Sequence, residues 1–238
     1  ASAYIKFGER TAAKYADEIV VLSRGNRDYF KREYGRETRF VPNGIAPEPD
    51  LPAIGITEKW GLSSSSYLLF LGRIVPEKGL HHLMKAYLGL ETDKSLVIAG
   101  GASDTNEYMA QIREAAQSDP RVVLVGHVEG ELLVELLSNA YCYVLPSDVE
   151  GMPMSLLEAM SHGRACVTSD IPECADVIKG VGVTFPAGNA RALREALASL
   201  LADPSRASSL GQMARSSALT DYDWESIVDR TLSLYGKS

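Results

Sequence analysis

A polar loop followed by a proline, near the middle of the chain, has the residue types of an anion-binding helix start. The run from Tyr141 to Leu145 is apolar and rich in strand formers, and the segment after Pro153 has helical spacing of apolar residues. Proline suits the first turn of a helix, so the backbone N–H groups of Met154 and Ser155 would be free there. Such a helix end attracts anions, of which phosphate is the usual one.

Two carboxylates bracket this helix start, Glu150 in the loop and Glu158 inside the helix, with seven residues between them. Near a phosphate they would repel the ligand, but a carboxylate accepts hydrogen bonds from hydroxyls, as an acid does from a ribose in dinucleotide folds. A ligand with phosphate in its middle and hydroxyls on both sides is a nucleotide sugar. The alternative is that both glutamates are solvated, one in a loop and one on an exposed helix face.

A second candidate site is the loop Gly72-Arg73-Ile74-Val75-Pro76-Glu77-Lys78-Gly79, which follows an apolar run. Arg73 and Lys78 could hold a diphosphate from both sides, while the glycines let the ligand approach the backbone. The loop lacks the Gly-Lys-Ser/Thr ending of a Walker motif. The alternative is a surface salt bridge with Glu77.

Regular alternation of strands and helices from residue 67 onward predicts the fold. Six short, mostly apolar runs separated by helical segments indicate an α/β fold with a doubly wound, Rossmann-like parallel sheet covered on both faces. Ligands of such sheets bind outside the carboxyl ends of the strands. The expected strands are 67–71, 95–99, 121–125, 141–145, 165–168 and 181–185; the expected helices are 79–89, 104–117, 130–139, 153–162 and 173–178, with closing helices at 189–202, 205–217 and 223–235.

Other strand ends carry weaker signals. Gly126 and His127 could offer backbone groups to a nucleobase edge, and His127 itself is interpreted as a surface or stacking residue. Gly100-Gly101 indicates a tight turn or close ligand approach, and Ser169 to Glu173 is a further turn into a helix. We interpret the remaining histidines as structural or solvated: His81, His82 and His162.

The first 43 residues predict a helix-strand-helix-strand start, at 4–17, 19–22, 24–34 and 38–41, followed by a proline-rich linker. The two helices are distinctly basic. Contact with an anionic membrane surface or a lipid diphosphate is one interpretation, and a solvated helix face is the other. The basic residues are Lys6, Arg10, Lys14, Arg24, Arg27, Lys31 and Arg32.

Composition excludes several classes of protein. A net charge of −7 and a pI near 5.2 argue against a nucleic-acid partner. The three cysteines, Cys142, Cys166 and Cys174, lack metal or redox spacing and predict reduced, buried thiols. No run reaches the roughly 18 to 20 apolar residues of a membrane span, and nothing resembles a signal peptide. Because the chain begins Ala-Ser-Ala, we expect a processed or truncated piece of a longer protein.

Together these motifs resemble the donor-binding domain of retaining GT-B glycosyltransferases of family 4. The resemblance covers nearly the whole chain, including a linker start at 41–44 and a first part that looks like the tail of an N-terminal acceptor domain. Each motif is weak alone, and the combination is specific. The matching motifs are Gly72-Arg73, Glu77-Lys78-Gly79, Gly126, Pro146-Ser147, Glu150-Gly151 and Leu157-Glu158-Ala159-Met160.

The resemblance implies a role for each residue. Arg73 and Lys78 would neutralise the departing diphosphate without a metal or other cofactor, Glu158 would bind the ribose, and Glu150 would contact the transferred sugar near the reacting carbon. Backbone amides from Gly151 to Ser155 would contact sugar and phosphate. Relatives often have Phe-Gly where this chain has Met152-Pro153, so side-chain contacts at this point differ.

The expected domains are a remnant of the acceptor domain (1–43), a linker (44–56), the nucleotide-sugar domain (57–219) and a crossover helix (220–238). The expected activity is transfer of a sugar from a nucleotide diphosphate sugar to a saccharide or lipid-linked acceptor with retention, in polysaccharide or glycolipid synthesis. The expected location is the cytoplasm, peripherally at the inner face of the cell membrane. Two alternatives stay open: a non-catalytic nucleotide-sugar binding subunit that needs a partner chain for its missing N-terminal half, and an epimerase of the same fold.

Overall fold

The structure, a computed structural model, describes residues 2–101 and 106–236. Its centre is a six-stranded parallel sheet in the order β5-β4-β3-β6-β7-β8. The order reverses between β3 (Tyr67–Leu71) and β6 (Cys142–Leu145), which lie side by side although 70 residues of sequence lie between the end of β3 and the start of β6. The predicted α/β doubly wound sheet is therefore confirmed, with all six expected strands present.

The elements of the sheet unit follow the predicted alternation closely. The other strands are β4 (Ser95–Ala99), β5 (Val122–Gly126), β7 (Ala165–Ser169) and β8 (Val183–Phe185). The helices are α3 (Gly55–Trp60), the 3-10 turn η1 (Pro76–Lys78), α4 (Leu80–Leu88), α5 (Asn106–Gln117), α6 (Glu131–Asn139), α7 (Met154–Ser161), α8 (Pro172–Ala175), α9 (Ala190–Ala202), α10 (Pro204–Asp221) and α11 (Trp224–Tyr235). The expected helix 104–117 begins outside the described residues, since 104 and 105 are not among them.

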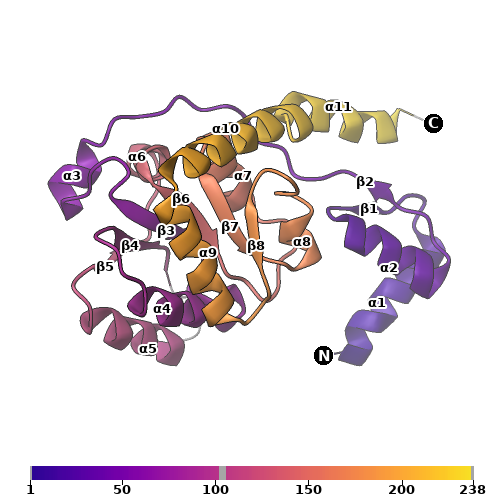
Figure 1. Cartoon of the computed structure of the whole chain (residues 1–238). Helices are drawn as coiled ribbons and strands as arrows, with labels where there is room; N and C mark the ends of the chain where they lie inside the picture. Colours follow the sequence, from indigo (N-terminus) through magenta and orange to yellow (C-terminus); the bar gives the residue numbers. More distant parts are fainter. Residues whose placement is uncertain (1, 102–105, 237–238) are drawn as a thin grey trace.

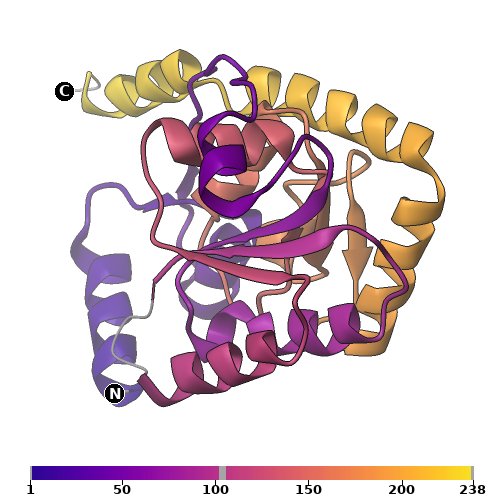
Figure 2. The ribbon, with the colours of Figure 1, turned by 90° about the vertical axis from the view of Figure 1, so that its left-hand side faces the viewer.

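Helices cover the sheet on both faces, which gives three layers (Figure 2). In β3, Leu68 and Phe70 pack into one core with α4, α5 and α9. Tyr67 and Leu69 pack into a second core with α3, α6 and α7. Because alternate side chains of a strand point to opposite faces, a strand covered on both faces has a continuous apolar sequence.

Two sequence features shape the closing helices. Asn189, Asp203 and Asp223 each accept a hydrogen bond from a backbone N–H in the first turn of the helix that they precede, which stabilises the starts of α9, α10 and α11. α10 packs against α7 and β7. A Cβ at Gly211 of α10 would collide with the carbonyl oxygen of Gly163, so only glycine permits this close approach.

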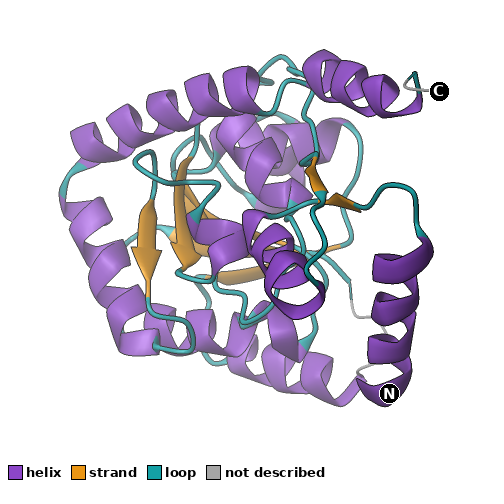
Figure 3. Cartoon of the chain, turned by 90° about the vertical axis from the view of Figure 1, so that its right-hand side faces the viewer, coloured by secondary structure: helices purple, strands orange, loops and turns teal. Residues whose placement is uncertain are grey.

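The N-terminal residues form a small unit beside α8, seen at the right of Figure 1 and again in Figure 3. It comprises α1 (Ser2–Tyr15), β1 (Val20–Val21), α2 (Arg24–Tyr34) and β2 (Arg39–Phe40), with β1 and β2 paired in parallel. α2 contacts α8, and α11 crosses back to this unit, where an Arg230 guanidinium nitrogen donates to the carbonyl oxygen of Phe40 at 2.6 Å. The predicted domain boundary at residues 43 and 44 stays a prediction.

The predicted linker, 44–56, falls mostly within an extended segment, residues 41–54, that follows the surface of the sheet unit and that we call the strap; its last two residues belong to α3. Ile45 forms a parallel bridge to Asp223, and Leu51 and Asn139 are hydrogen-bonded. The side chain of Glu135, in α6, is 8% exposed and accepts hydrogen bonds from the N–H groups of Ile54 and Ile56. The strap is therefore held along its length by backbone and side-chain contacts.

The three cysteines are buried and free, as the sequence predicted. Burial raises the pKa of Cys142 to about 12 and raises that of Cys166 and Cys174 further. Within the described residues, no helix is both long and apolar enough to cross a bilayer.

Candidate functional site

The candidate site lies at the carboxyl ends of β3 and β6, where the strand order reverses. The loop 72–79 leaves β3 and the loop 146–153 leaves β6, so the two predicted ligand-binding loops are neighbours. In open α/β sheets this is the position of the ligand crevice. The fold thus brings together two motifs that are about 70 residues apart in the sequence.

Backbone contacts fix the two loops against each other. The N–H of Asp148 donates to the carbonyl oxygen of Glu77 at 2.9 Å. Gly79 has a φ of 65°, and a Cβ there would collide with the carbonyl oxygen of Pro146. Gly100, after β4, would likewise collide with the carbonyl oxygen of Gly72 if it carried a Cβ. The glycines at these two positions therefore permit close backbone packing.

Lys78 and Glu150 form the polar centre of the site. The Nζ of Lys78 lies 2.6 Å from the Oε1 of Glu150, and the same oxygen accepts a hydrogen bond from the hydroxyl of Ser147 at 2.6 Å. The side chains of Lys78 and Glu150 are 16% and 5% exposed, so the pair is largely removed from solvent. Such a charge pair is favourable only when it is well hydrogen-bonded, as this one is.

Arg73 is the exposed cation of the site. Its guanidinium lies 3.9 Å from the carboxylate of Glu77, with the two side chains 65% and 46% exposed. The surface salt bridge that the sequence offered as an alternative is therefore present. An exposed pair of this kind is worth little, so the guanidinium can turn toward an anion at low cost.

The start of α7 leaves backbone donors without a side-chain cap. Pro153 occupies the N-cap position itself, one residue earlier than the first helical turn, and makes no capping hydrogen bond. The hydroxyl of Ser155 accepts a hydrogen bond from the Tyr143 hydroxyl at 2.7 Å. Gly151 is exposed in the loop before this helix. The helix start thus keeps the donors that an anion would need.

The two methionines beside the helix start contact other parts of the chain. The N–H of Asn43 donates to the sulfur of Met152 at 3.1 Å, and the Asn43 side chain donates to the Met152 carbonyl oxygen. Met154 lines an apolar groove with Trp224 and Leu232. Their side chains are therefore engaged with the strap and with α11.

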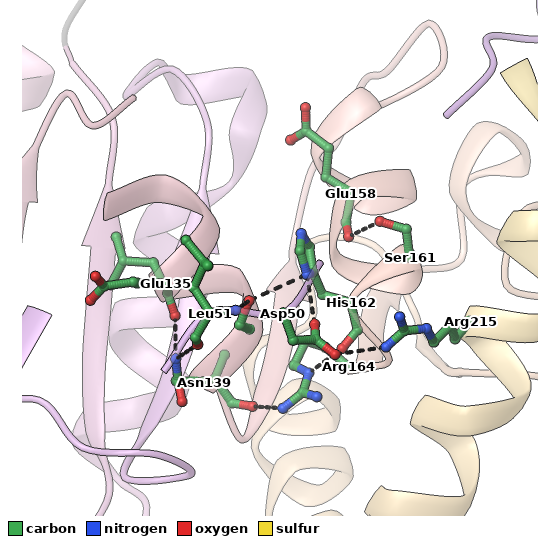
Figure 4. Close-up of polar contacts among 12 residues, drawn as sticks. Asp50, Leu51, Glu135, Asn139, Glu158, Ser161, His162, Arg164 and Arg215 are labelled. Atoms are coloured by element: carbon green, nitrogen blue, oxygen red, sulfur yellow. Dashed lines mark hydrogen bonds and ion pairs between the residues drawn. The ribbon is translucent and has the colours of Figure 1, made fainter. Parts of the chain in front are cut away.

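Glu158 occupies a different environment from Glu150. It lines a pocket between the strap and α6, with Glu48 and Gly130 among the lining residues. Burial and, secondarily, the charge of Glu48 raise the pKa of Glu158. Figure 4 shows its carboxylate pointing away from the polar cluster of His162 and Arg215.

Gly126 and His127 lie at the carboxyl end of β5. The carbonyl oxygen of Gly126 accepts a hydrogen bond from the N–H of Gly100 at 2.7 Å, and Gly126 has a φ of 75°. The His127 side chain is 77% exposed, and its Nε2 lies 3.8 Å from a carboxylate oxygen of Glu129. Glu129 is only two residues after His127, so the sequence itself offers this acidic neighbour.

Comparison with known proteins places the chain in a family. The family model described as "Glycosyl transferases group 1" matches residues 56–217. The chain belongs to this family. It is 33% identical to an alpha-maltose-1-phosphate synthase of Mycolicibacterium smegmatis, an alignment that covers 96% of this chain and 65% of the relative.

Solved structures agree with the GT-B fold of this family. Sucrose-phosphate synthase from Thermosynechococcus elongatus superimposes with a TM-score of 0.88 and 24% identity, over 99% of this chain and 61% of that one. Anabaena Alr3699/HepE, solved in complex with UDP and glucose, has a TM-score of 0.87 and 17% identity, over 98% of this chain and 67% of that one. The glycosyl transferases group 1 chain thus spans about two thirds of the length of these proteins.

Sequence reasoning missed three hydroxyl-bearing residues that support the site of this group 1 chain. Ser147 holds Glu150, Tyr143 holds Ser155, and the Ser169 hydroxyl donates to the carbonyl oxygen of Ser147. Ser147 lies within the motif and precedes Glu150 by three residues, a spacing that could have signalled the contact. Nothing in the apolar run 141–145 distinguished Tyr143 as a hydrogen-bond donor.

A partly buried polar network that joins the strap to the end of α7 and to α10 was also missed. The Nδ1 of His162, 2% exposed, lies 2.8 Å from Oδ1 of Asp50, and Arg215 donates to the other oxygen of Asp50 at 2.7 Å (Figure 4). Burial alone would raise the pKa of Asp50, but hydrogen bonds from His162 and Arg215 outweigh it and lower that pKa. In this group 1 chain the network fixes the strap next to the helix that carries Glu158.

Proposed function

We propose that this chain is the donor-binding part of a retaining glycosyltransferase that uses a nucleotide diphosphate sugar. The observation that supports the proposal best is the ion pair between Lys78 and Glu150. It joins a cation and an acid from two different loops at the place where the strand order of the sheet reverses. Membership of the glycosyl transferases group 1 family supports it independently.

In this proposal the diphosphate lies between the two loops. Arg73 and Lys78 neutralise its charge as it leaves, while the uncapped N–H groups of Met154 and Ser155 face its oxygens. Lys78 has three N–H donors, so it can hold a phosphate oxygen and keep one contact with Glu150. Glu150 then accepts from hydroxyls of the transferred sugar, with its carboxylate oriented by Ser147. No metal ion is needed for this charge neutralisation.

The nucleoside extends from this point toward α6. Glu158 accepts from the ribose hydroxyls in the pocket that it lines with Gly130, and the backbone of Gly126 and His127 faces the base. A Cβ at Gly101 or Gly126 would meet no atom within 4 Å, so the backbone is open at these two positions. The remaining backbone amides, from Gly151 to Met154, contact the sugar and phosphate.

The acceptor half belongs to the longer protein of which we infer this chain to be a part. The acceptor is a saccharide or a lipid-linked molecule, and transfer proceeds with retention in polysaccharide or glycolipid synthesis. The basic helices α1 and α2 suit an anionic membrane surface, which would locate the enzyme at the cytoplasmic face of the cell membrane. A nucleotide-sugar binding subunit that needs a partner chain for turnover is the second candidate, supported by the same geometry.

Calorimetric titration tests the proposal directly. We expect UDP, GDP or dTDP, and the corresponding sugar nucleotides, to bind without added metal. Arg73→Ala should weaken that binding by about 1 to 3 kcal/mol, the range for hydrogen bonds to charged groups. Arg191, which pairs with Glu195 on the exposed face of α9, provides the matched control, and Arg191→Ala should bind as the unchanged chain does. Equal affinity in the Arg73 and Arg191 variants would remove the diphosphate assignment.

An assay of sugar transfer distinguishes the transferase from the non-catalytic binding subunit. The full-length protein should transfer sugar from the best donor to a saccharide or lipid-linked acceptor, and the product's anomeric configuration should match that of the donor. Binding without transfer, restored by a partner chain, would favour the subunit. Formation of an epimeric sugar nucleotide without acceptor would contradict both.

A further inference from the structure

Two adjacent histidines and an aspartate form a cluster beside the candidate donor site. One donor atom from each of His81, His82 and Asp148 lies within 4.8 Å of the other two. The two histidines lie in the first turn of α4, and Asp148 lies in the loop after β6, so the cluster joins two separate elements. Both histidines were expected to be structural or solvated, but the fold gives them a common neighbour in Asp148.

Residues outside α4 contact the two imidazole rings and orient them. The imidazole centroids of His81 and His82 are 3.9 Å apart, and the Nε2 of His82 lies 3.6 Å from Oδ2 of Asp148. On the other side, the Nδ1 of His81 lies 2.8 Å from the hydroxyl oxygen of Tyr108, which also accepts from the backbone N–H of His81. If Nδ1 carries the hydrogen of that contact, Nε2 of His81 keeps its lone pair for a ligand.

This donor set has the chemistry of a transition-metal site. Two imidazoles and one carboxylate, with a further position open to solvent, are typical of zinc, whereas magnesium and calcium prefer all-oxygen ligands. In a tetrahedral zinc site the ligand atoms are roughly 3.3 Å apart. The donor atoms of the cluster, within 4.8 Å of one another, would have to move closer together by about 1.5 Å at most to reach that spacing.

One further contact favours a metal over a simple ion pair. A hydrogen bond to the second ring nitrogen is the usual way in which a metal-binding histidine is oriented, and Tyr108 provides it here.

We propose that His81, His82 and Asp148 bind a divalent transition-metal ion of the zinc type. The bound ion would connect the start of α4 to the loop that also carries Ser147 and Glu150, two residues after Asp148. The site stands apart from the proposed donor chemistry, which needs no metal. Its test therefore does not depend on transfer activity.

Zinc titration of the untagged chain, against a chromophoric chelator in a non-coordinating buffer at pH 7.5, is the direct experiment. We expect one saturable site, and His82→Ala and Asp148→Asn should each weaken zinc affinity by more than about tenfold, because even outer-shell partners contribute about 10- to 100-fold. Tyr108→Phe, which removes only the orienting hydroxyl, should weaken it by roughly tenfold. Zinc should also raise the melting temperature of the unchanged chain more than that of the His82 variant.

His127 supplies the matched control, since it is an exposed histidine near a carboxylate outside the cluster. His127→Ala should keep the zinc affinity of the unchanged chain. Circular dichroism of each variant establishes that it is folded. Equal zinc affinity in the unchanged chain and in folded His82 and Asp148 variants would overturn the proposal, as would magnesium competing with zinc at equal concentration.

Discussion

The ammonium group of Lys78 lies 2.6 Å from the carboxylate of Glu150, although 72 residues separate them in the sequence. Because Lys78 ends the turn after β3 and Glu150 lies in the loop after β6, the contact connects the two halves of the sheet where its strand order reverses. The same two residues are proposed to bind opposite parts of the donor. Stability and donor binding are therefore expected to be coupled at this pair.

A double-mutant cycle on the pair measures that coupling. Lys78→Ala leaves a carboxylate that is only 5% exposed without its cation, so we expect the free energy of unfolding to fall by about 1 to 3 kcal/mol. Adding Glu150→Gln should recover part of that loss, because the uncompensated charge is then removed. Urea denaturation of the two single variants and the double variant measures the interaction; strict additivity would show that the contact does not stabilise the fold.

Glu158→Gln should affect stability and binding in opposite directions. Burial raises the pKa of Glu158, so the folded state prefers the neutral acid. The stability that this preference contributes is fully present below the unfolded pKa and is lost as the pH rises through the folded pKa. At pH 7 the charged form is penalised, and a neutral glutamine should raise the melting temperature.

The same Glu158→Gln variant should bind nucleoside diphosphate more weakly, by about 1.5 to 3 kcal/mol, if the carboxylate accepts from the ribose. Calorimetry at pH 7 measures the affinity. A matched comparison is Glu48→Gln, which removes the other carboxylate of the pocket. Affinity lost in the Glu48 variant but unchanged in the Glu158 variant would contradict the ribose assignment.

Tyr143→Phe should loosen the start of α7. The buried hydroxyl of Tyr143 lies 2.7 Å from the Ser155 hydroxyl and 3.2 Å from the carbonyl oxygen of Leu71, and burial raises the pKa of Tyr143 so that it stays a neutral donor. Without the Tyr143 hydroxyl, the Ser155 hydroxyl and the Leu71 carbonyl oxygen lose this partner, and the free energy of unfolding should fall by about 1 to 2 kcal/mol. Ser155→Ala in the same background should cost little more, because the two groups share one contact; a full additional loss would contradict this coupling.

Asp50→Asn should detach part of the strap and reduce the acid sensitivity of the fold. The hydrogen bonds from His162 and Arg215 lower the pKa of Asp50, against the effect of burial, so Asp50 contributes stability above its unfolded pKa of about 3.9. That stability is lost as the pH falls through the lower, folded pKa. Between about pH 5 and pH 2, the free energy of unfolding should therefore decrease less steeply with falling pH in the variant than in the unchanged chain.

Limited proteolysis provides an independent readout of the strap. Cleavage between residues 46 and 54 should become faster in Asp50→Asn, because the amide has no charge and only one acceptor oxygen, which weakens the contacts with His162 and Arg215. Asp93→Asn, which changes an aspartate outside the strap, is the control and should be cleaved as the unchanged chain is. Equal cleavage rates in the two variants would show that the other strap contacts are sufficient.

Local sequence patterns determined the helices and strands of this fold, because strand composition and helix capping depend on residues that are close together in the sequence. The apolar runs of β3, β6 and β7 need only their own composition to predict buried strands, and Asp203 or Asp223 marks a helix start within four residues. The loops with Arg73, Lys78 and Glu150 could be placed at the strand ends for the same reason. Parallel strands with intervening helices leave few possible topologies.

The tertiary structure alone decided which of those residues meet. No local rule pairs Lys78 with Glu150, Asp50 with His162, or His82 with Asp148, since each contact depends on the order of strands and on the path of the strap across the sheet unit. The linker looked structureless because its hydrogen-bond partners are distant in sequence rather than local. Burial, which sets the charge preference of Glu158, likewise arises only when the strap and α6 are packed around it.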